Sequence, residues 1–168
     1  GDGGQRYPTY TQELCDAMGR LADGADILMP NLTEASILIG TEYPGQDLTD
    51  PQVDEILRDL LDLGAKNVVL KGIDRNDGKL RNYVVNKRDG VDQKKELAHE
   101  KLPFMIHGTG DAFASALCGA VMAGRSLPQA AYIAGEFVRN SMVSTRNQPH
   151  FEERGVSFEL NLKELTDL

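Results

Sequence analysis

Residues 50–70 have the sequence DPQVDEILRDLLDLGAKNVVL, which predicts an amphipathic helix followed by a short apolar strand. Asp50 is predicted as the N-cap, Pro51 as the first helical residue and Gly64 as the end of the helix. The run Val68-Val69-Leu70 is typical of a buried parallel strand. The apolar residues of the helix recur with helical spacing and predict one buried stripe: Val53, Ile56, Leu57, Leu60 and Leu61.

Helical and strand patterns alternate on both sides of this stretch. The alternation predicts a single α/β domain over residues 1–168, with a mostly parallel sheet and helices on both faces. Turn-forming sequences between residues 73 and 106 predict an inserted antiparallel patch. Further helices are predicted over residues 11–22, 33–39, 111–123 and 126–145, further strands at 27–29, 83–85 and 96–100, and a strand with a short helix in the tail 155–168.

The composition restricts the classes of partner. Lys and Arg number 18 against 26 Asp and Glu, so the formal net charge is −8. An acidic protein is a poor match for nucleic acid or an anionic membrane surface, because both attract basic proteins. We find no apolar run long enough for a transmembrane helix and no secretory signal, and we expect a cytoplasmic protein. Cys118 lies in an apolar helical stretch and is expected to be a buried free thiol.

The strongest candidate site is His107-Gly108-Thr109-Gly110-Asp111. The two glycines let the backbone turn and approach a ligand closely, and the turn leads into a helix whose free N–H groups suit a phosphate or a developing oxyanion. Asp111 at the helix start is placed to accept a proton from an attacking hydroxyl. The alternative is a plain strand-to-helix turn, in which Asp111 only favours the helix dipole. The helix that follows is almost entirely apolar and is expected to be buried in the centre of the fold.

A second motif is Pro30-Asn31-Leu32-Thr33-Glu34, directly after the strand predicted at 27–29. Asn31 and Glu34 could meet Mg²⁺ or its waters beside a nucleotide phosphate, as hard oxygen ligands do. The same spacing is also that of a helix capping box, and on spacing alone the capping box is favoured.

The third candidate is Lys71-Gly72, at the end of the strand at 68–70. Lys71 could reach phosphate oxygens as a point charge, although a lysine in this position is more often solvated. His107 is interpreted as structural, and Asp74 and Asp77 as residues that serve a turn.

In their order along the chain, these motifs resemble those of the vitamin B6 (pyridoxal and pyridoxamine) kinases of the ribokinase-like superfamily. The stretch from Gly108 to Asp111 is similar to their anion hole and catalytic aspartate, and residues 30–34 are similar to their Asn-x-x-Glu motif. The opening Gly1-Asp2-Gly3-Gly4 resembles the end of their Asp-Pro-Val-Met-Gly-Asp segment. The similarity runs through nearly all of the chain and implies a three-layer α/β/α fold. Members are considerably longer, so we expect this chain, which does not begin with Met, to be their C-terminal part.

The resemblance implies transfer of the γ-phosphoryl group of ATP to the 5′-hydroxymethyl group of pyridoxal, pyridoxamine or pyridoxine. Asp111 would be the general base, and the N–H groups of Gly108, Thr109 and Gly110 would form the anion hole. Residues 73–101 would cover the nucleotide, and the enzyme would be a homodimer. Several members have Thr or Ser in the position of Lys71, so this sequence departs from the pattern there. The remaining implied ligands are Asn31, Glu34, Lys71 and Gly72 for the nucleotide and Asp2 and Glu34 for Mg²⁺.

Other functions fit the same residues. A hydroxymethylpyrimidine kinase of thiamine synthesis shares the motifs and has a similar ring substrate. A catalytically incomplete nucleotide-binding piece that associates with another chain is a second alternative. An α/β interaction module without chemistry is a third, and it predicts no stabilisation by Mg-ATP.

Overall fold

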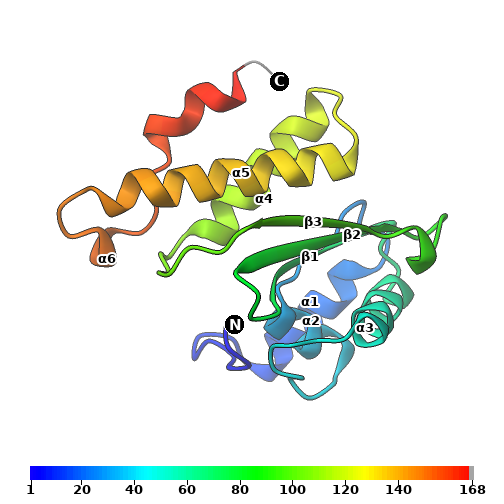
Figure 1. The fold of residues 1–168 in the computed structure, drawn as a ribbon. Helices are drawn as coiled ribbons and strands as arrows, with labels where there is room; N and C mark the ends of the chain where they lie inside the picture. Colours follow the sequence, from blue (N-terminus) through cyan, green and yellow to red (C-terminus); the bar gives the residue numbers. More distant parts are fainter. Residues whose placement is uncertain (167–168) are drawn as a thin grey trace. The chain divides into compact units, whose positions relative to one another are not determined.

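The computed structural model describes residues 1–166, apart from the side chain of Glu152 (Figure 1). The chain forms two compact units, the N-terminal unit of residues 1–98 and the C-terminal unit of residues 99–168. The last two residues of the predicted tail lie outside the described residues. The elements are α1 (Gln12–Ala22), α2 (Leu32–Ile39), α3 (Asp50–Asp62), β1 (Asn67–Asp74), β2 (Lys79–Asn86), η1 (Val91–Gln93), β3 (Lys95–Glu100), α4 (Thr109–Met122), α5 (Leu127–Arg146), α6 (Phe151–Arg154) and η2 (Glu159–Leu165).

The sheet has the order β1-β2-β3. β1 and β2 pair antiparallel, with Asn67 opposite Asn86 at one end. This agrees with the antiparallel patch that the turn-forming sequences predict. The strand expected at 27–29 lies on the other side of β1 and pairs with it in parallel, through isolated bridges from Leu28 to Val68 and from Asn31 to Lys71. Parallel pairing in the described residues is confined to these bridges.

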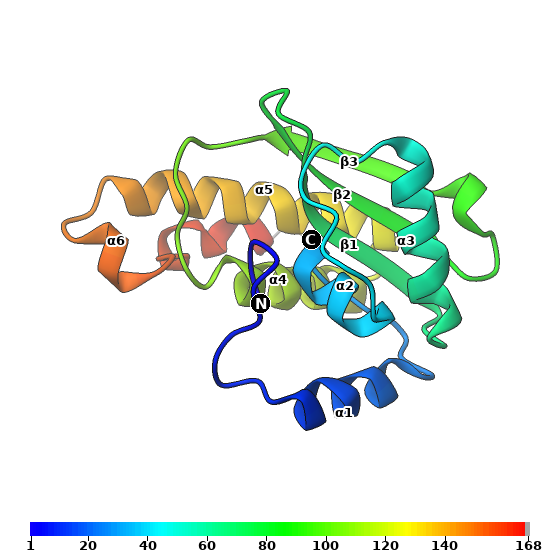
Figure 2. The same cartoon turned by 90° about the horizontal axis from the view of Figure 1, so that it is seen from below.

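Helices α2 and α3 both pack on β1 and cover one face of the sheet (Figure 2). The stripe predicted for α3 is buried as expected, with Val53, Leu57 and Leu60 fully enclosed. These side chains meet Val68 and Leu70 of β1 in one apolar cluster. Burial of this stripe stabilises the N-terminal unit, since each enclosed aliphatic side chain contributes about 1.5–3 kcal/mol.

The N-cap predicted for α3 is wrong by one residue. The helix begins at Asp50, and Thr49 is the N-cap, with its N–H donating to Gln52 Oε1 at 2.9 Å. Asp50 instead accepts a hydrogen bond from Arg75 Nη2 at 2.7 Å. Gly64 does follow the helix end, and its φ of +110° is a conformation that glycine adopts without strain.

A polar network holds β2 against β3 within the N-terminal unit. The hydroxyl of Tyr83, which is fully buried, donates to Glu96 Oε2 at 3.0 Å, and Arg81 Nε donates to Glu96 Oε1 at 2.9 Å. Arg81 also forms an ion pair with Asp77 in the turn between β1 and β2. The predicted turn roles are confirmed, because Asp74 Oδ1 and Asp77 Oδ1 each accept a backbone N–H within the turn.

In the C-terminal unit, α4 packs along α5. The expectation that α4 is buried in the centre of the fold is wrong for one of its faces. Its inner face is buried through Ala112, Phe113 and Leu117, whereas Met122 is 86% exposed. Cys118 is also exposed, which contradicts the expected buried thiol, while Cys15 of α1 is buried. The apolar composition of α4 reflects small side chains as well as burial, so it did not indicate which face lies outward.

Helix α5 begins with a capping box, with Ser126 as N-cap and Gln129 as its partner. The strand expected in the tail is absent from the described residues 155–166, and the 3₁₀ helix η2 (Glu159–Leu165) in this segment packs on α5. Among residues 1–166, no helix is both long enough and apolar enough to cross a membrane.

The Tyr83 hydroxyl provides a test of this packing through pH. Burial, with the neighbouring Glu96 carboxylate, raises the pKa of Tyr83 to about 12 from its ordinary value of 10. The folded state therefore keeps a proton that the unfolded chain loses above pH 10, so stability falls as the pH rises from 10 to 12. We expect denaturant titrations to show a loss on the order of 2 kcal/mol over this range, smaller in Tyr83→Phe. Equal losses in both proteins would contradict the assignment.

Candidate functional site

The first turn of α4 has the backbone arrangement of an anion-binding site. Gly108 is the N-cap, with a φ of +84°, a left-handed conformation that residues other than glycine rarely adopt. The helix begins at Thr109, two residues before the predicted start, and its first backbone bond runs from the Ala112 N–H to the Gly108 carbonyl. Among the described residues, the N–H groups of Thr109, Gly110 and Asp111 have no hydrogen-bond acceptor. They are the free donors, backed by the helix dipole, that bind phosphate groups.

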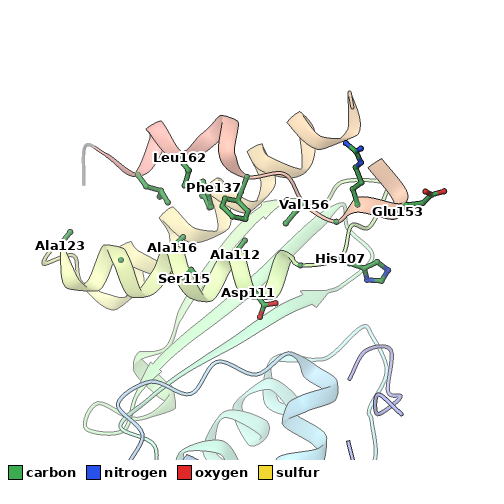
Figure 3. A pocket seen from close by; sticks show the side chains of 16 residues that line it. His107, Asp111, Ala112, Ser115, Ala116, Ala123, Phe137, Glu153, Val156 and Leu162 are labelled. Atoms are coloured by element: carbon green, nitrogen blue, oxygen red, sulfur yellow. The ribbon is translucent and has the colours of Figure 1, made fainter. Parts of the chain in front are cut away.

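Asp111 is the third residue of α4, and its side chain is exposed. In Figure 3 its carboxylate projects from the first turn, away from Phe137 and Leu162. No cation pairs with this carboxylate among the described residues, so it is free to accept a proton from a ligand hydroxyl. The predicted catalytic aspartate and the predicted anion hole therefore share one helical turn.

The C-terminal tail holds the loop that precedes α4. The Val156 N–H donates to the His107 carbonyl at 2.9 Å. Gly155 allows this contact, because a Cβ there would lie 3.2 Å from the same carbonyl oxygen. His107 itself is exposed, and its main chain makes the contact, which agrees with the structural interpretation. Sequence reasoning missed Gly155 and Val156, since nothing in their spacing links them to Gly108.

A cation–π contact holds the same loop from another side. The guanidinium of Arg146, in the last turn of α5, lies 4.9 Å from the ring centroid of Phe104. The Phe151 ring of α6 meets Phe104 edge-on, with 6.2 Å between centroids. The cation–π contact between Arg146 and Phe104 contributes about 0.5–1 kcal/mol where such a contact is exposed. The loop from Phe104 to Gly108 is thus fixed before any ligand binds.

A pocket of about 850 Å³ opens beside the first turn of α4 (Figure 3). Its walls come from α4, from Phe137 of α5 and from the tail, including Val156 and Leu162. His107 and Asp111 are among its lining residues, although the Asp111 carboxylate points away from the Phe137 and Leu162 wall (Figure 3), and most of the remaining lining is apolar. A hollow with a few polar groups at one end is typical of small-molecule sites.

The motif at residues 30–34 lies in the N-terminal unit and forms the predicted capping box. Asn31 Oδ1 accepts the Glu34 N–H, and Glu34 Oε2 accepts the Asn31 N–H, both at 2.8 Å. The amide of Asn31 also donates to the Gly1 carbonyl at 3.0 Å, which places the opening segment beside this helix start. Asp2 is exposed in a turn of that segment. The capping interpretation is confirmed, and it leaves Glu34 Oε1 without a hydrogen bond from the described residues.

Lys71 lies next to this motif. Its N–H donates to the Pro30 carbonyl at 2.9 Å, and Lys71 pairs with Asn31 across the parallel bridge. A β-bulge between Leu70 and Ile73 interrupts the register with β2 at this point. A bulge redirects the side chains around it, and such irregularities are frequent next to functional sites.

Asn82 of β2 holds the bulge in place. It is buried, and its Oδ1 accepts the Gly72 N–H at 3.1 Å. Gly72 has a φ of +71°, and the space beside its Cα is empty, so backbone conformation alone accounts for glycine there. Asn82 therefore fixes the conformation that presents Lys71, and no sequence motif indicated it.

The structure brings the candidate residues together in two sets. Gly108, Thr109, Gly110 and Asp111 share the start of α4 in the C-terminal unit. The other set gathers in the N-terminal unit, around the start of α2 and the end of the parallel pairing: Asp2, Asn31, Glu34, Lys71 and Gly72. Among residues 1–166, no cluster of three or more His, Cys, Asp or Glu side chains forms a preformed metal site.

Comparison with known proteins identifies the class. The family model described as phosphomethylpyrimidine kinase matches residues 5–154, which is most of the chain. The chain belongs to the phosphomethylpyrimidine kinase family.

Two curated relatives come from Saccharomyces cerevisiae. The hydroxymethylpyrimidine/phosphomethylpyrimidine kinase THI20 is 33% identical over 128 residues, which are 73% of this chain and 23% of THI20. The thiamine biosynthesis protein THI22 is 32% identical over 142 residues, which are 80% of this chain and 24% of THI22. The chain therefore spans about a quarter of the length of these relatives.

Solved structures show the same fold. A Bacteroides thetaiotaomicron protein, proposed to be a phosphomethylpyrimidine kinase, matches with a TM-score of 0.90 and 31% identity, over 100% of this chain and 57% of its own. The pyridoxal kinase from Lactobacillus plantarum matches with a TM-score of 0.84 and 25% identity, over 98% of this chain and 58% of its own. The predicted ribokinase-like α/β fold is confirmed, with the chain spanning little more than half of these structures.

The bulge contact gives a prediction. Replacing Asn82 by Leu leaves the Gly72 N–H without its acceptor in a partly buried place, so the unfolding free energy should fall by about 1–3 kcal/mol. Urea denaturation would measure the change, and Asn147→Leu, at an exposed asparagine, is the control and should change stability by much less. Hydrogen exchange of the Gly72 amide should also become faster in Asn82→Leu. An unchanged exchange rate would show that the Asn82 contact does not protect the bulge.

Proposed function

We propose that this chain carries the catalytic and nucleotide-binding part of a kinase. It would transfer the γ-phosphoryl group of ATP to a hydroxymethyl group on a six-membered nitrogen heterocycle. Pyridoxal, pyridoxamine and pyridoxine are the first candidate substrates. The observation that carries the proposal is the first turn of α4, where three free N–H groups and the exposed Asp111 carboxylate lie together in a chain of this family.

Asp111 is the general base of the proposed reaction. It takes the proton of the substrate hydroxyl as the hydroxyl oxygen forms its bond to the γ-phosphorus and the bond to the leaving ADP breaks. The free N–H groups at the start of α4 stabilise the negative charge on the oxygens of the phosphoryl group while it is transferred. Because the loop before Gly108 is already fixed by Val156 and Arg146, these donors need little reorganisation during the reaction.

In the N-terminal unit, Lys71 and Gly72 are the proposed phosphate contacts, and Asn31 and Glu34 the proposed contacts to the nucleotide and its metal. Mg²⁺ in such sites is held by one or two carboxylates together with phosphates and waters. The donor set fits that pattern: Asp2 is exposed, and Glu34 Oε1 accepts no hydrogen bond from the described residues and has only the Gly1 amino group, 4.0 Å away, as an ion-pair partner there. Bound there, Mg²⁺ would neutralise charge on the phosphates. Asn31 keeps Glu34 in place through the capping box.

The choice of ring rests on two further observations. The Bacteroides thetaiotaomicron protein also has a crystal form with pyridoxal, with a TM-score of 0.89 to this chain, which supports a pyridine substrate. The matching family model and THI20 are named for pyrimidine kinases, which supports hydroxymethylpyrimidine as the second candidate. Both rings carry the same reacting group, so one site geometry serves either.

Asp111→Asn tests the role of the base. The variant keeps the size of the side chain and the helix start but removes the proton acceptor. We expect turnover with the preferred ring substrate to fall by a factor of about 10²–10⁴, with the Kd for Mg-ATP nearly unchanged. An ATP-consumption assay with pyridoxal, pyridoxamine and hydroxymethylpyrimidine measures the first, and calorimetry measures the second.

Asp62→Asn, at an exposed position in α3, is the matched control and should behave as the unchanged chain. Turnover with the pyrimidine alone would assign the second candidate. Stabilisation by Mg-ATP without turnover on any ring would indicate a catalytically incomplete nucleotide-binding piece. A chain that is neither active nor stabilised by Mg-ATP would contradict the proposal.

Lys71→Met tests the phosphate contact. A lysine that pairs with a phosphate contributes a charge-assisted hydrogen bond, so we expect the Kd for Mg-ADP to rise about tenfold. Lys163→Met removes an equal charge from an exposed position in η2, outside the segment expected to cover the nucleotide, and should leave the Kd within about twofold. Equal effects of the two substitutions would show that Lys71 acts only through net charge.

A further inference from the structure

The tail is joined to the last turn of α5 through the hydroxyl of Thr145. This residue is fully buried, and its Oγ1 donates to the Ser141 carbonyl at 2.6 Å while it accepts the Ser157 N–H at 2.9 Å. The Ser157 hydroxyl donates in turn to Gln148 Oε1 at 3.1 Å, just beyond the end of α5. A buried hydroxyl that is donor and acceptor at once holds both of its partners in place.

Hydrogen bonds, more than apolar burial, hold this part of the tail. Residues 155–158 are half-buried or exposed. In the described part of the chain, two backbone N–H groups of this segment donate to residues before the tail, those of Val156 and Ser157. The Phe158 ring adds an apolar contact, with 6.5 Å between its centroid and that of Phe137, but Phe158 is exposed. Loss of either backbone bond should therefore loosen the segment.

The same segment sets the orientation of the anion-binding turn. The Val156 N–H, next to the Ser157 bond, donates to the His107 carbonyl at 2.9 Å. That carbonyl lies in one rigid peptide plane with the Gly108 nitrogen, so holding the carbonyl holds the plane from which α4 starts. The Val156 side chain also lies close to Gly108, since a Cβ there would be 3.5 Å from Val156 Cγ1. The φ of +84° at Gly108, which aims the free N–H groups of residues 109–111, is thus supported from the tail.

We infer that Thr145 is a positioning residue for the anion-binding turn and, through it, for phosphoryl transfer. Thr145 is buried and acts through the tail: its hydroxyl holds Ser157, the adjacent Val156 then holds the His107 carbonyl, and the turn keeps its direction. The role in phosphoryl transfer rests on the proposed function, because the turn is the proposed anion hole. Preorganised donors are effective because they do not have to move as charge develops.

Ser141 offers a matched control one turn earlier in α5. It is fully buried, as Thr145 is, yet among the described residues its hydroxyl has no hydrogen-bond partner. Ser141→Ala therefore removes a buried hydroxyl from the same helix and leaves the tail bonds intact. Thr145→Val removes a hydroxyl that has two partners, and valine keeps the branching of threonine at Cβ. The pair separates the contact with the tail from general damage to α5.

The test measures the turn and the reaction separately. NMR gives the amide exchange rates of Val156 and Ser157, and the amide shifts of residues 109–111 give the Kd for inorganic phosphate. We expect Thr145→Val to speed both exchange rates about tenfold and to raise the phosphate Kd about fivefold. In the ATP-consumption assay, kcat should fall about tenfold. Thr145→Ser keeps the hydroxyl and should restore all of these values to within about twofold, and Ser141→Ala should match the unchanged chain.

Gly155→Ala reaches the same carbonyl without a change in α5. Gly155 has a φ of +77°, and an added Cβ would lie 3.2 Å from the His107 oxygen, so the methyl group should displace that carbonyl. The phosphate Kd and kcat should change in the same direction as in Thr145→Val. Circular dichroism of each variant would confirm that the helices are retained.

The inference is overturned if Thr145→Val leaves the Val156 exchange rate and the phosphate Kd unchanged, or if an active chain keeps its kcat in this variant. Failure of Thr145→Ser to restore the values, or an equal loss in Ser141→Ala, would also overturn it. So would an unchanged chain that binds no phosphate at the start of α4, because there is then no site to position. A chain that shows the expected effects on exchange and on phosphate binding, yet has no turnover on any ring, would contradict the proposed function and support the role of Thr145 at the turn.

Discussion

The parallel pairing of residues 28–31 with β1 is the constraint on which the N-terminal unit depends. It anchors the chain just before α2, so that Asn31 caps the helix while the Lys71 N–H bonds to Pro30. Proline has no N–H to donate, and here only its carbonyl is needed. One short stretch of backbone hydrogen bonds thereby joins two motifs that are about forty residues apart, and it does so before any ligand is present.

In the C-terminal unit, the loop before α4 is held by residues that are distant from it in the sequence. Gly108 sets the direction of α4 through its backbone conformation, but the loop before it is held by the tail at Val156 and by Arg146 at the end of α5. The turn and its supports are separated by more than thirty residues. A site for phosphoryl transfer needs donors that stay in place as charge develops, and these supports provide the rigidity.

The sequence indicated the elements well because periodicity and capping are local. The stripe of α3, the box at Asn31 and Glu34 and the glycine before α4 follow from side chains within a few residues of one another. Non-local packing was not visible. The exposure of Cys118 depends on which side of an almost wholly apolar helix lies outward, and the role of Asn82 depends on a bulge in another strand. The prediction of Asp50 as N-cap was wrong because threonine and aspartate both cap helices, so residue type does not distinguish Asp50 from Thr49 before it.

The exposure of Cys118 makes the protein suited to spectroscopic work as it stands. The other cysteine, Cys15, is buried, so a thiol-reactive dye should label one position under native conditions. Cys118 is seven residues after Asp111 on the same helix, about 10 Å along its axis. A fluorophore there would sit two turns from the start of α4, near enough to sense whether that end is occupied and far enough to leave its donors free.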